Sequence, residues 1–160
     1  MNRGAILALI CSGAFGCGGV PKQGEPLMES VTTYNDGVRW DRLAIAASRV
    51  PVAEREDFID EKDELTETLK ITDWEIKRVS DDGPGRARVH VKYTWYRDDE
   101  GVVRHTQAVQ KWERKGKAWL IVDERYARGD EMPGLAAKAE DEEDEGEGDA
   151  GPDDEKTEVR

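Results

Sequence analysis

The sequence predicts an α+β domain in which N-terminal helices pack on one face of a curved antiparallel sheet. Two of the supporting observations are periods. Apolar residues between 26 and 69 recur about every 3.6 positions, whereas those between 71 and 123 alternate with a period of about 2. The third observation is that all five tryptophans lie within residues 26–128. This segment is therefore the one that can build a hydrophobic core, and we expect a single domain over residues 26–129.

Helices are expected in the first half of this domain. Pro26 is favourable at a helix start, and Leu27, Val31 and Tyr34 then share one face. The Asn35-Asp36-Gly37 sequence is expected to interrupt or end this helix.

Two further helices are expected before the sheet. The segment from Trp40 to Val50 is amphipathic, and Pro51 stops or redirects the chain. Residues 53–69 are mostly strong helix formers with sparse apolar contacts, so this helix is expected to lie on the surface. The apolar side of the middle helix comprises Trp40, Leu43, Ala44 and Ala47.

Four strands are expected to follow as an antiparallel meander. Their predicted ranges are 71–79, 86–97, 102–113 and 118–123, and Gly- and Asp-containing turns separate them. The second strand alternates most clearly, as a half-buried antiparallel strand requires. Its expected inward residues are Ala87, Val89, Val91, Tyr93 and Trp95.

Residues 26–125 resemble the nuclear transport factor 2-like (cystatin-like cone) superfamily. The resemblance rests on an amphipathic opening with Tyr34 and Trp40, and on a closing hairpin in which residues 106–112 lead through Gly116 into the strand that begins at Trp119. It implies helices on a curved, cone-shaped sheet. The superfamily includes isomerases, cyclases, dehydratases and non-catalytic binding modules, so the fold alone does not choose among these activities.

The N-terminus indicates a secreted, lipid-anchored protein. Arg3 precedes an apolar stretch over residues 5–15, which is shorter than the roughly 20 residues that a membrane span needs and is typical of a signal peptide. The following Ala14-Phe15-Gly16-Cys17 resembles the lipobox of bacterial prolipoproteins. This resemblance implies lipid on the Cys17 thiol and cleavage between Gly16 and Cys17, so that residues 1–16 are removed. The alternative is an ordinary secretory peptide cut near Ala14 or Gly16.

Cysteine usage supports the lipoprotein interpretation. Cys11 would leave with the signal peptide, so the mature chain would keep Cys17 alone. Residues 17–25 are rich in glycine and predict a tether. Gly18 after the cysteine, by resemblance to enteric lipoproteins, favours the outer membrane. We therefore expect the protein to be lipid-anchored in the cell envelope, facing the periplasm or the outside.

Residues 130–160 predict a disordered acidic tail. They hold 14 of the 36 acidic residues and 3 of the 24 basic ones, a net charge of −11, which leaves the remaining chain close to neutral. Deleting this tail is expected to leave the thermal midpoint nearly unchanged, because it buries little. The overall acidity also argues against nucleic acid as a partner.

Few residues point to chemistry. An enzyme of the ketosteroid-isomerase or SnoaL-like kind would need a general base and a proton donor inside the cone. The candidates are Tyr34, Asp41, His90, His105 and Asp123, none of which lies in a specific motif. No metal site is expected from two distant histidines, and no cofactor motif is found.

A ligand pocket is the other candidate site. Aromatic walls with a few polar groups are typical of such pockets, although large aromatics in a small domain also serve as core. The candidate ligand-binding residues are Tyr34, Trp95, Trp112 and His105. The amides of Gln107 and Gln110 lie either in such a pocket or on the surface.

The sequence thus favours a lipid-anchored envelope protein with a non-catalytic binding or scaffolding domain. The alternative is a small enzyme of the ketosteroid-isomerase or SnoaL-like type that acts on a hydrophobic substrate. The expected partners are the membrane, through the N-terminal lipid, and either an envelope protein or a small hydrophobic ligand. A homodimer through the curved sheet face is a further option, which an exposed apolar patch on that sheet would favour.

Overall fold

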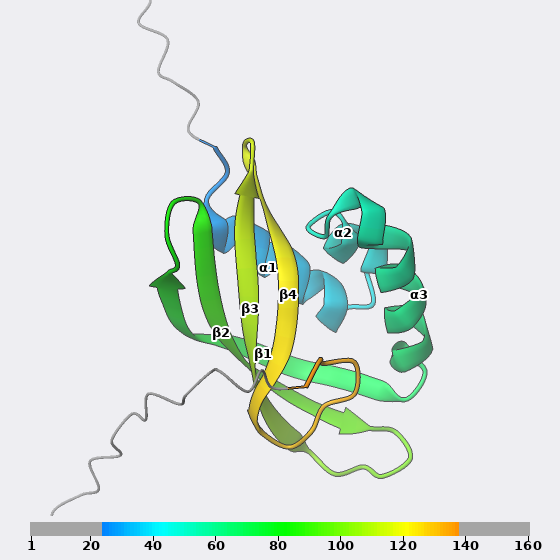
Figure 1. The fold of residues 1–160 in the computed structure, drawn as a ribbon. Coiled ribbons are helices and arrows are strands. Elements are labelled where there is room, and N and C mark those ends of the chain that lie inside the picture. The colour runs from blue at the N-terminus through cyan, green and yellow to red at the C-terminus, as the bar shows by residue number, and fades with distance from the viewer. Residues whose placement is uncertain (1–23, 138–160) are drawn as a thin grey trace, which may run out of the picture.

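The computed structural model describes residues 24–137 (Figure 1). Four strands form one antiparallel sheet in the order β1-β2-β3-β4. Helices precede all four strands along the chain, as the sequence predicts. The elements are α1 (Leu27–Arg39), α2 (Leu43–Ala47), the 3₁₀ turn η1 (Val52–Glu54), α3 (Arg55–Thr66), β1 (Leu69–Asp81), β2 (Arg86–Arg97), β3 (Arg104–Lys115) and β4 (Ala118–Gly129).

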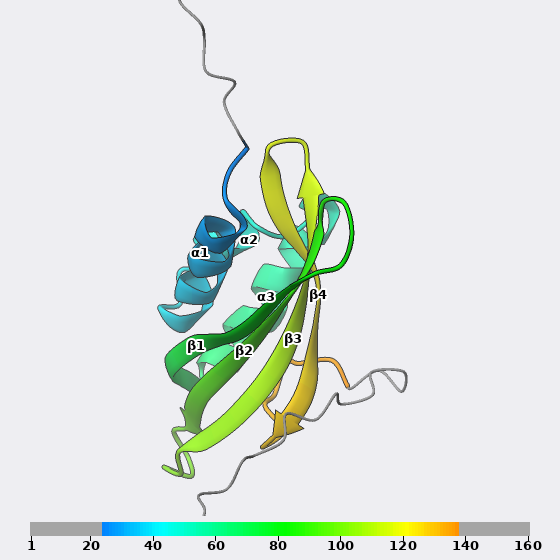
Figure 2. The ribbon, with the colours of Figure 1, turned by 90° about the vertical axis from the view of Figure 1, so that its left-hand side faces the viewer.

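The molecule has two layers, with the helices on one face of a bent sheet (Figure 2). The pairing of β1 with β2 shifts register at two places, between Ile71 and Asp73 and between Ile76 and Arg78. The pairing of β3 with β4 also shifts twice, so that Val122 and Ala127 are extra residues on β4. Because a bulged strand bends and twists, these four irregularities curve the sheet around the helices.

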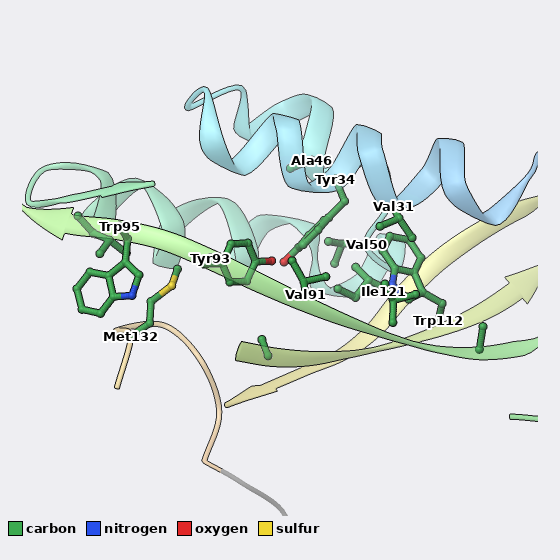
Figure 3. Close-up of a cluster of buried hydrophobic side chains, with 14 residues drawn as sticks. Val31, Tyr34, Ala46, Val50, Val91, Tyr93, Trp95, Trp112, Ile121 and Met132 are labelled. Carbon is green, nitrogen blue, oxygen red and sulfur yellow. The ribbon is translucent and has the colours of Figure 1, made fainter. Parts of the chain in front are cut away.

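The hydrophobic core lies between the helices and the concave face of the sheet (Figure 3). The predicted inward face of β2 is confirmed, since its five members are all buried: Ala87, Val89, Val91, Tyr93 and Trp95. Trp95 and Trp112 are each only 1% exposed. Large buried aromatics supply much of the apolar burial that a domain of this size needs.

The first helix does not stop at the Asn35-Asp36-Gly37 sequence, contrary to the sequence prediction. It continues to Arg39, and Asn35 and Gly37 are buried within it. A Cβ at Gly37 would lie 2.7 Å from the backbone nitrogen of Ala46. Glycine is therefore present because α2 approaches α1 closely, and this long-range contact outweighs the low helix propensity of glycine.

The second helix is shorter than predicted, and Trp40 is not on its buried side. Trp40 is 58% exposed and forms the C-cap of α1, with the Arg39 guanidinium 4.8 Å from its ring centroid. Asp41 follows with φ of 53° and turns the chain into α2. Ala44, also expected on the apolar side, is exposed, whereas Leu43 and Ala47 are buried as predicted.

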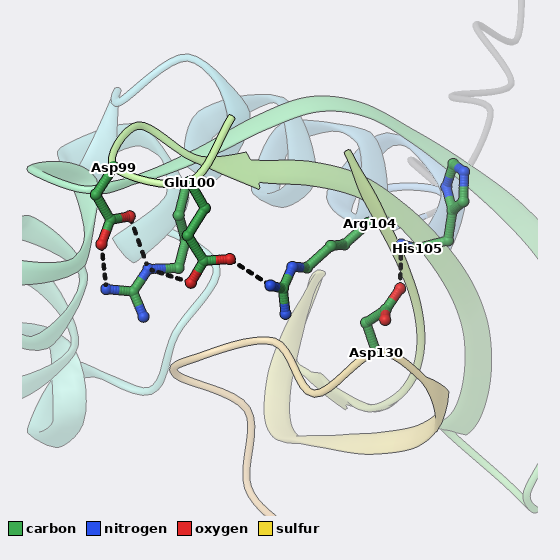
Figure 4. A network of polar contacts seen from close by, with 6 residues as sticks. Asp99, Glu100, Arg104, His105 and Asp130 are labelled. Carbon is green, nitrogen blue, oxygen red and sulfur yellow. Dashed lines mark hydrogen bonds and ion pairs between the residues drawn. The ribbon is translucent and has the colours of Figure 1, made fainter. Parts of the chain in front are cut away.

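The ordered chain extends further than the sequence predicts at two places near its C-terminus. Strand β4 runs to Gly129, six residues past the predicted end at Asp123. The chain after Gly129 also packs on the domain, because Met132 is 8% exposed and Asp130 Oδ2 accepts a hydrogen bond from His105 N at 2.9 Å (Figure 4). The predicted tail boundary at residue 130 is therefore too early, and residues 138–160 of the predicted tail lie outside the described residues.

Two backbone hydrogen bonds join the outer edge of β4 to other segments, and a third joins the N-terminal chain to the turn just before β4. Glu25 N donates to Lys117 O at 2.8 Å, Ile121 N donates to Arg49 O at 2.8 Å, and Tyr126 N donates to Ala136 O at 2.9 Å. Covering an edge in this way prevents it from pairing with another chain.

Two truncated chains will separate the contribution of residues 130–137 from that of the residues that follow. A chain that ends at residue 129 is expected to unfold about 2–4 kcal/mol more easily than one that ends at residue 137, because it loses the buried Met132. In a domain of this size, that loss lowers the thermal midpoint by roughly 10 °C or more. Equal midpoints, measured by circular dichroism, would show that residues 130–137 do not contribute to stability.

Candidate functional site

Five polar side chains meet in the interior between α1 and the sheet. We call them the interior polar cluster: Tyr34 and Asn35 from α1, Tyr93 from β2, Gln110 from β3 and Glu124 from β4. Gln110 is paired with Glu124 in the β3–β4 register, which places both side chains on the concave face. The cluster therefore joins three neighbouring strands to the helix that covers them.

The Glu124 carboxylate is the shared acceptor of the cluster. The Tyr34 hydroxyl donates to Glu124 Oε2 at 2.9 Å. The Tyr93 hydroxyl lies 2.7 Å from Glu124 Oε1 and 2.5 Å from Asn35 Oδ1, and it shares its single proton between these two acceptors. Figure 3 shows the two phenol groups reaching toward each other from opposite layers.

The Gln110 amide completes the cluster. Its Nε2 donates to Glu124 Oε1 at 2.8 Å and to Asn35 Oδ1 at 2.9 Å. Its Oε1 accepts from the indole Nε1 of Trp112 at 3.2 Å. The Asn35 Nδ2 in turn donates to Val31 O at 2.8 Å, one turn back along α1. The polar groups of Asn35 and Gln110, which are 1% and 0% exposed, are thus paired inside the protein.

Both tyrosines are held in their neutral form. Burial raises the pKa of Tyr34 well above its ordinary value, and the nearby negative charge of Glu124 raises it further. The pKa of Tyr93 is raised by burial first and then by the same carboxylate. At neutral pH each phenol is therefore a hydrogen-bond donor and not a base.

Two buried phenols and a half-buried carboxylate are groups that general acid–base catalysis uses. Here, however, they donate to and accept from one another. The structure has an open groove of about 460 Å³ between α1 and α2 and a small cavity of about 30 Å³ beside α3 and β1. Neither of these two is lined by a member of the interior polar cluster.

Three of the four predicted ligand-binding residues, Tyr34, Trp95 and Trp112, belong to the hydrophobic core. Tyr34 is part of the interior polar cluster, and Trp112 donates to it. Trp95 is also buried, and its Nε1 donates to Thr106 Oγ1 at 2.8 Å. His105 is exposed on the opposite face of β3, where its ring nitrogen lies 3.2 Å from Thr94 Oγ1.

The other predicted acid–base candidates do not converge on Tyr34. His90 lies on the outer face of β2, with Nε2 3.1 Å from the Arg78 guanidinium. Asp123 points outward as well, toward Lys111 and Arg125. Asp41 is exposed at the turn between α1 and α2, and its carboxylate lies 3.8 Å from Lys70 Nζ.

Three members of the cluster were not identified as site residues from the sequence: Asn35, Tyr93 and Glu124. Gln110 was expected either in a pocket or on the surface, and it is instead fully buried in the core. Tyr93 carried a usable signal, because a hydroxyl on the inward side of a clearly alternating strand needs a buried partner. Glu124 carried none, because the extra residue Val122 changes which β4 side chains face inward.

Several predictions concern residues that the structure does not describe. Gly16, Cys17, the signal peptide and most of the tether lie before residue 24, outside the described residues. Between residues 24 and 137, no group of three or more His, Cys, Asp or Glu side chains is arranged to hold a metal ion. Over the same range, no helix combines the length and apolar character needed to cross a membrane.

Comparison with solved structures identifies the fold. A ketosteroid isomerase-like protein from Erwinia carotovora atroseptica SCRI1043 matches 66% of this chain and 95% of its own, with a TM-score of 0.54 and 12% identity. A SEC-C motif-containing protein from Rhodopseudomonas palustris matches 59% of this chain and 73% of its own, with a TM-score of 0.51 and 12% identity. No protein-family model and no curated protein matches the sequence. The described domain thus has a ketosteroid isomerase-like, nuclear transport factor 2-like fold, as predicted.

Proposed function

We propose that this protein is a lipid-anchored lipoprotein of the cell envelope whose domain acts by non-catalytic binding or scaffolding. The observation that carries the non-catalytic part is the interior polar cluster. In a catalytic cone, a general base and its donor must face a substrate. Here the half-buried Glu124 carboxylate accepts from both tyrosines and Gln110, so three of its hydrogen bonds are made within the protein.

The lipoprotein part of the proposal rests on the sequence before the described domain. Cys17 ends the apolar segment where the lipidated cysteine of a lipobox belongs. Two or three acyl chains on this residue give stable membrane anchoring, whereas one chain alone would be marginal. The described domain begins at Gly24, a few residues later, so the anchor would hold it close to the membrane.

Replacing the lipobox cysteine tests the anchor. Cys17→Ala is expected to remove the acyl mass and to move the protein from the membrane fraction to the soluble fraction. The matched control is Cys11→Ala, which changes a cysteine in the apolar segment and should leave both properties unchanged. Intact-mass analysis and fractionation provide the readouts. An unchanged distribution for Cys17→Ala, or a mature N-terminus other than Cys17, would contradict the proposal.

The enzyme alternative has one observation in its favour, which is the nature of the clustered groups. Tyr34, Tyr93 and Glu124 provide two neutral proton donors and a carboxylate inside an apolar cone. For catalysis, a substrate would have to separate these groups and replace their mutual hydrogen bonds. The stability of Glu124 variants distinguishes this alternative from the structural role, as the Discussion argues.

A partner that binds the outer sheet face would meet charges there. Val79 and Val122 are the only large apolar side chains of the described strands that are more than a third exposed, and they lie on opposite edge strands. The face between them carries ion pairs such as Lys92 with Glu75 and Lys111 with Asp123. A homodimer through this face would therefore depend on polar contacts, and it remains a prediction.

A further inference from the structure

The N-terminal chain enters the domain beside the tip of the β3–β4 hairpin (Figure 1). Glu25 N donates to Lys117 O at 2.8 Å. The Arg114 side chain packs over Gly24, with its Nη2 only 2.5 Å from where a Cβ on that glycine would lie. The first described residues are thus fixed to this hairpin, and the segment that leads back to Cys17 starts there.

The same end of the sheet is rich in exposed cations. We call Arg86, Arg114, Lys115 and Lys117 the basic tip, and all four are exposed. Glu113 pairs with Lys115, and the adjacent β1–β2 hairpin adds Asp81 and Asp82, of which Asp82 pairs with Arg88. With Arg88 included, these eight side chains carry a net charge of +2. Among residues 24–137, nothing lies within 4 Å of the Cβ position of Gly116, so the rest of the described domain does not cover this hairpin end.

The opposite end of the sheet is acidic. The β2–β3 turn carries Asp98, Asp99 and Glu100, and the segment after β4 begins with Asp130 and Glu131. Arg97 and Arg104 pair with part of this charge (Figure 4). The charges of the domain are therefore separated along the strands, with the cations at the end that the N-terminal chain enters.

We propose that the basic tip is a second membrane contact, which binds anionic lipid headgroups and turns this end of the domain toward the bilayer. The inference rests on the lipid anchor of the proposed function. Seven Cα–Cα steps join Cys17 to Gly24, so the tip stays within about 25 Å of the lipidated residue. A tether of this length lets the tip reach within a Debye length of an anionic surface, about 8 Å at physiological ionic strength, where its cations are attracted to the headgroups.

Lipidated protein reconstituted into vesicles provides the test. A fluorophore on Ala118→Cys reports the position of the tip, because Cys17 is blocked by lipid and Cys11 is removed with the signal peptide. Headgroup-labelled quencher lipid should quench this fluorophore in vesicles of phosphatidylcholine mixed with phosphatidylglycerol, and added salt should relieve the quenching. Lys115→Gln with Lys117→Gln should lower the tip–membrane association constant about 25-fold, at about fivefold per cation.

The matched control removes two cations from the other end of the sheet, through Arg97→Gln with Arg128→Gln, and should leave the quenching unchanged. Equal quenching in phosphatidylcholine alone, or equal quenching for the tip and control variants, would overturn the inference.

Failure of the anchor itself has a different result. If the protein carries a bare Cys17 thiol and is not retained on neutral vesicles, the anchor is refuted. Flotation of the same chain with phosphatidylglycerol vesicles then tests the tip alone. Binding that the Lys115→Gln and Lys117→Gln pair weakens supports the inference, whereas no binding, or binding that this pair leaves unchanged, overturns it.

Discussion

Replacing Glu124 by leucine is expected to lower the free energy of unfolding by about 3–5 kcal/mol. The substitution leaves Tyr34 without an acceptor and removes one acceptor each from Tyr93 and Gln110, and all three side chains are buried. A buried donor that loses its partner costs about 1–3 kcal/mol, and hydrogen bonds to a charged acceptor lie at the upper end of that range. Urea unfolding followed by circular dichroism measures the change as a lower midpoint with an unchanged slope.

The neighbouring residue provides a matched control. Asp123→Leu makes the same kind of change one position earlier on β4, where the carboxylate faces outward and pairs with Arg125 and Lys111. Partly exposed ion pairs of this kind contribute about 0–1 kcal/mol. Comparable losses for Asp123→Leu and Glu124→Leu would contradict the structural role of the cluster.

The sign of the Glu124 effect also separates the two functions. Active-site groups are commonly held in arrangements that cost stability, so their removal often stabilises the protein while it abolishes activity. A structural cluster behaves in the opposite way, because its members satisfy one another. A gain in stability for Glu124→Leu would therefore favour the enzyme alternative over a binding or scaffolding domain.

The inward residues of β2 could be predicted from the sequence because its alternation is unbroken from Ala87 to Trp95. The same reasoning fails on β4. Val122 is an extra residue in the pairing with β3, so Ile121 and Glu124 face inward although they are three positions apart. Strict alternation would have placed Asp123 beside Ile121 on the inner face. A bulge depends on how two strands fit together, and one strand's sequence does not show it.

Long-range contacts explain the other differences between prediction and structure. Gly37 lies inside α1 because Ala46 comes close to it, and nothing in the local sequence indicates that contact. Met132 is buried although acidic and turn-forming residues surround it in the sequence. Gln110 is surrounded by partners that come from three other elements. In each case, the residue's role depends on a neighbour distant in sequence.

The interior polar cluster also explains why the covering helix has one defined position. An apolar interface between α1 and the sheet would tolerate small shifts, since apolar contacts have little directional preference. Tyr34 donates to Glu124 on β4, and Asn35 accepts from Tyr93 on β2 and Gln110 on β3, and these directional bonds form for one placement of α1 only. A domain fixed in this way presents a constant surface, which suits binding or scaffolding better than a cone that must open for a substrate.

Alkaline unfolding is expected to be steep, because the two cluster tyrosines keep their protons in the folded state. In the unfolded chain a tyrosine ionises near pH 10, whereas the pKa of Tyr34 and that of Tyr93 are raised well above this value in the fold. Above pH 10 the unfolded state therefore binds fewer protons than the folded state, so stability falls as pH rises. Each tyrosine contributes a slope of about 1.4 kcal/mol per pH unit, and the pair contributes about 2.7.

The Tyr34→Phe and Tyr93→Phe double variant isolates this contribution. It should be less stable than the wild type at neutral pH, because Glu124 then loses two of its donors. Between pH 10 and 11.5, however, it should lose up to about 3 kcal/mol less than the wild type over the same interval. The full contribution is present below pH 10 and is lost as the pH rises toward the folded-state pKa values. Parallel pH profiles for the two proteins, measured by urea unfolding, would show that these phenols ionise as readily in the fold as in the unfolded chain.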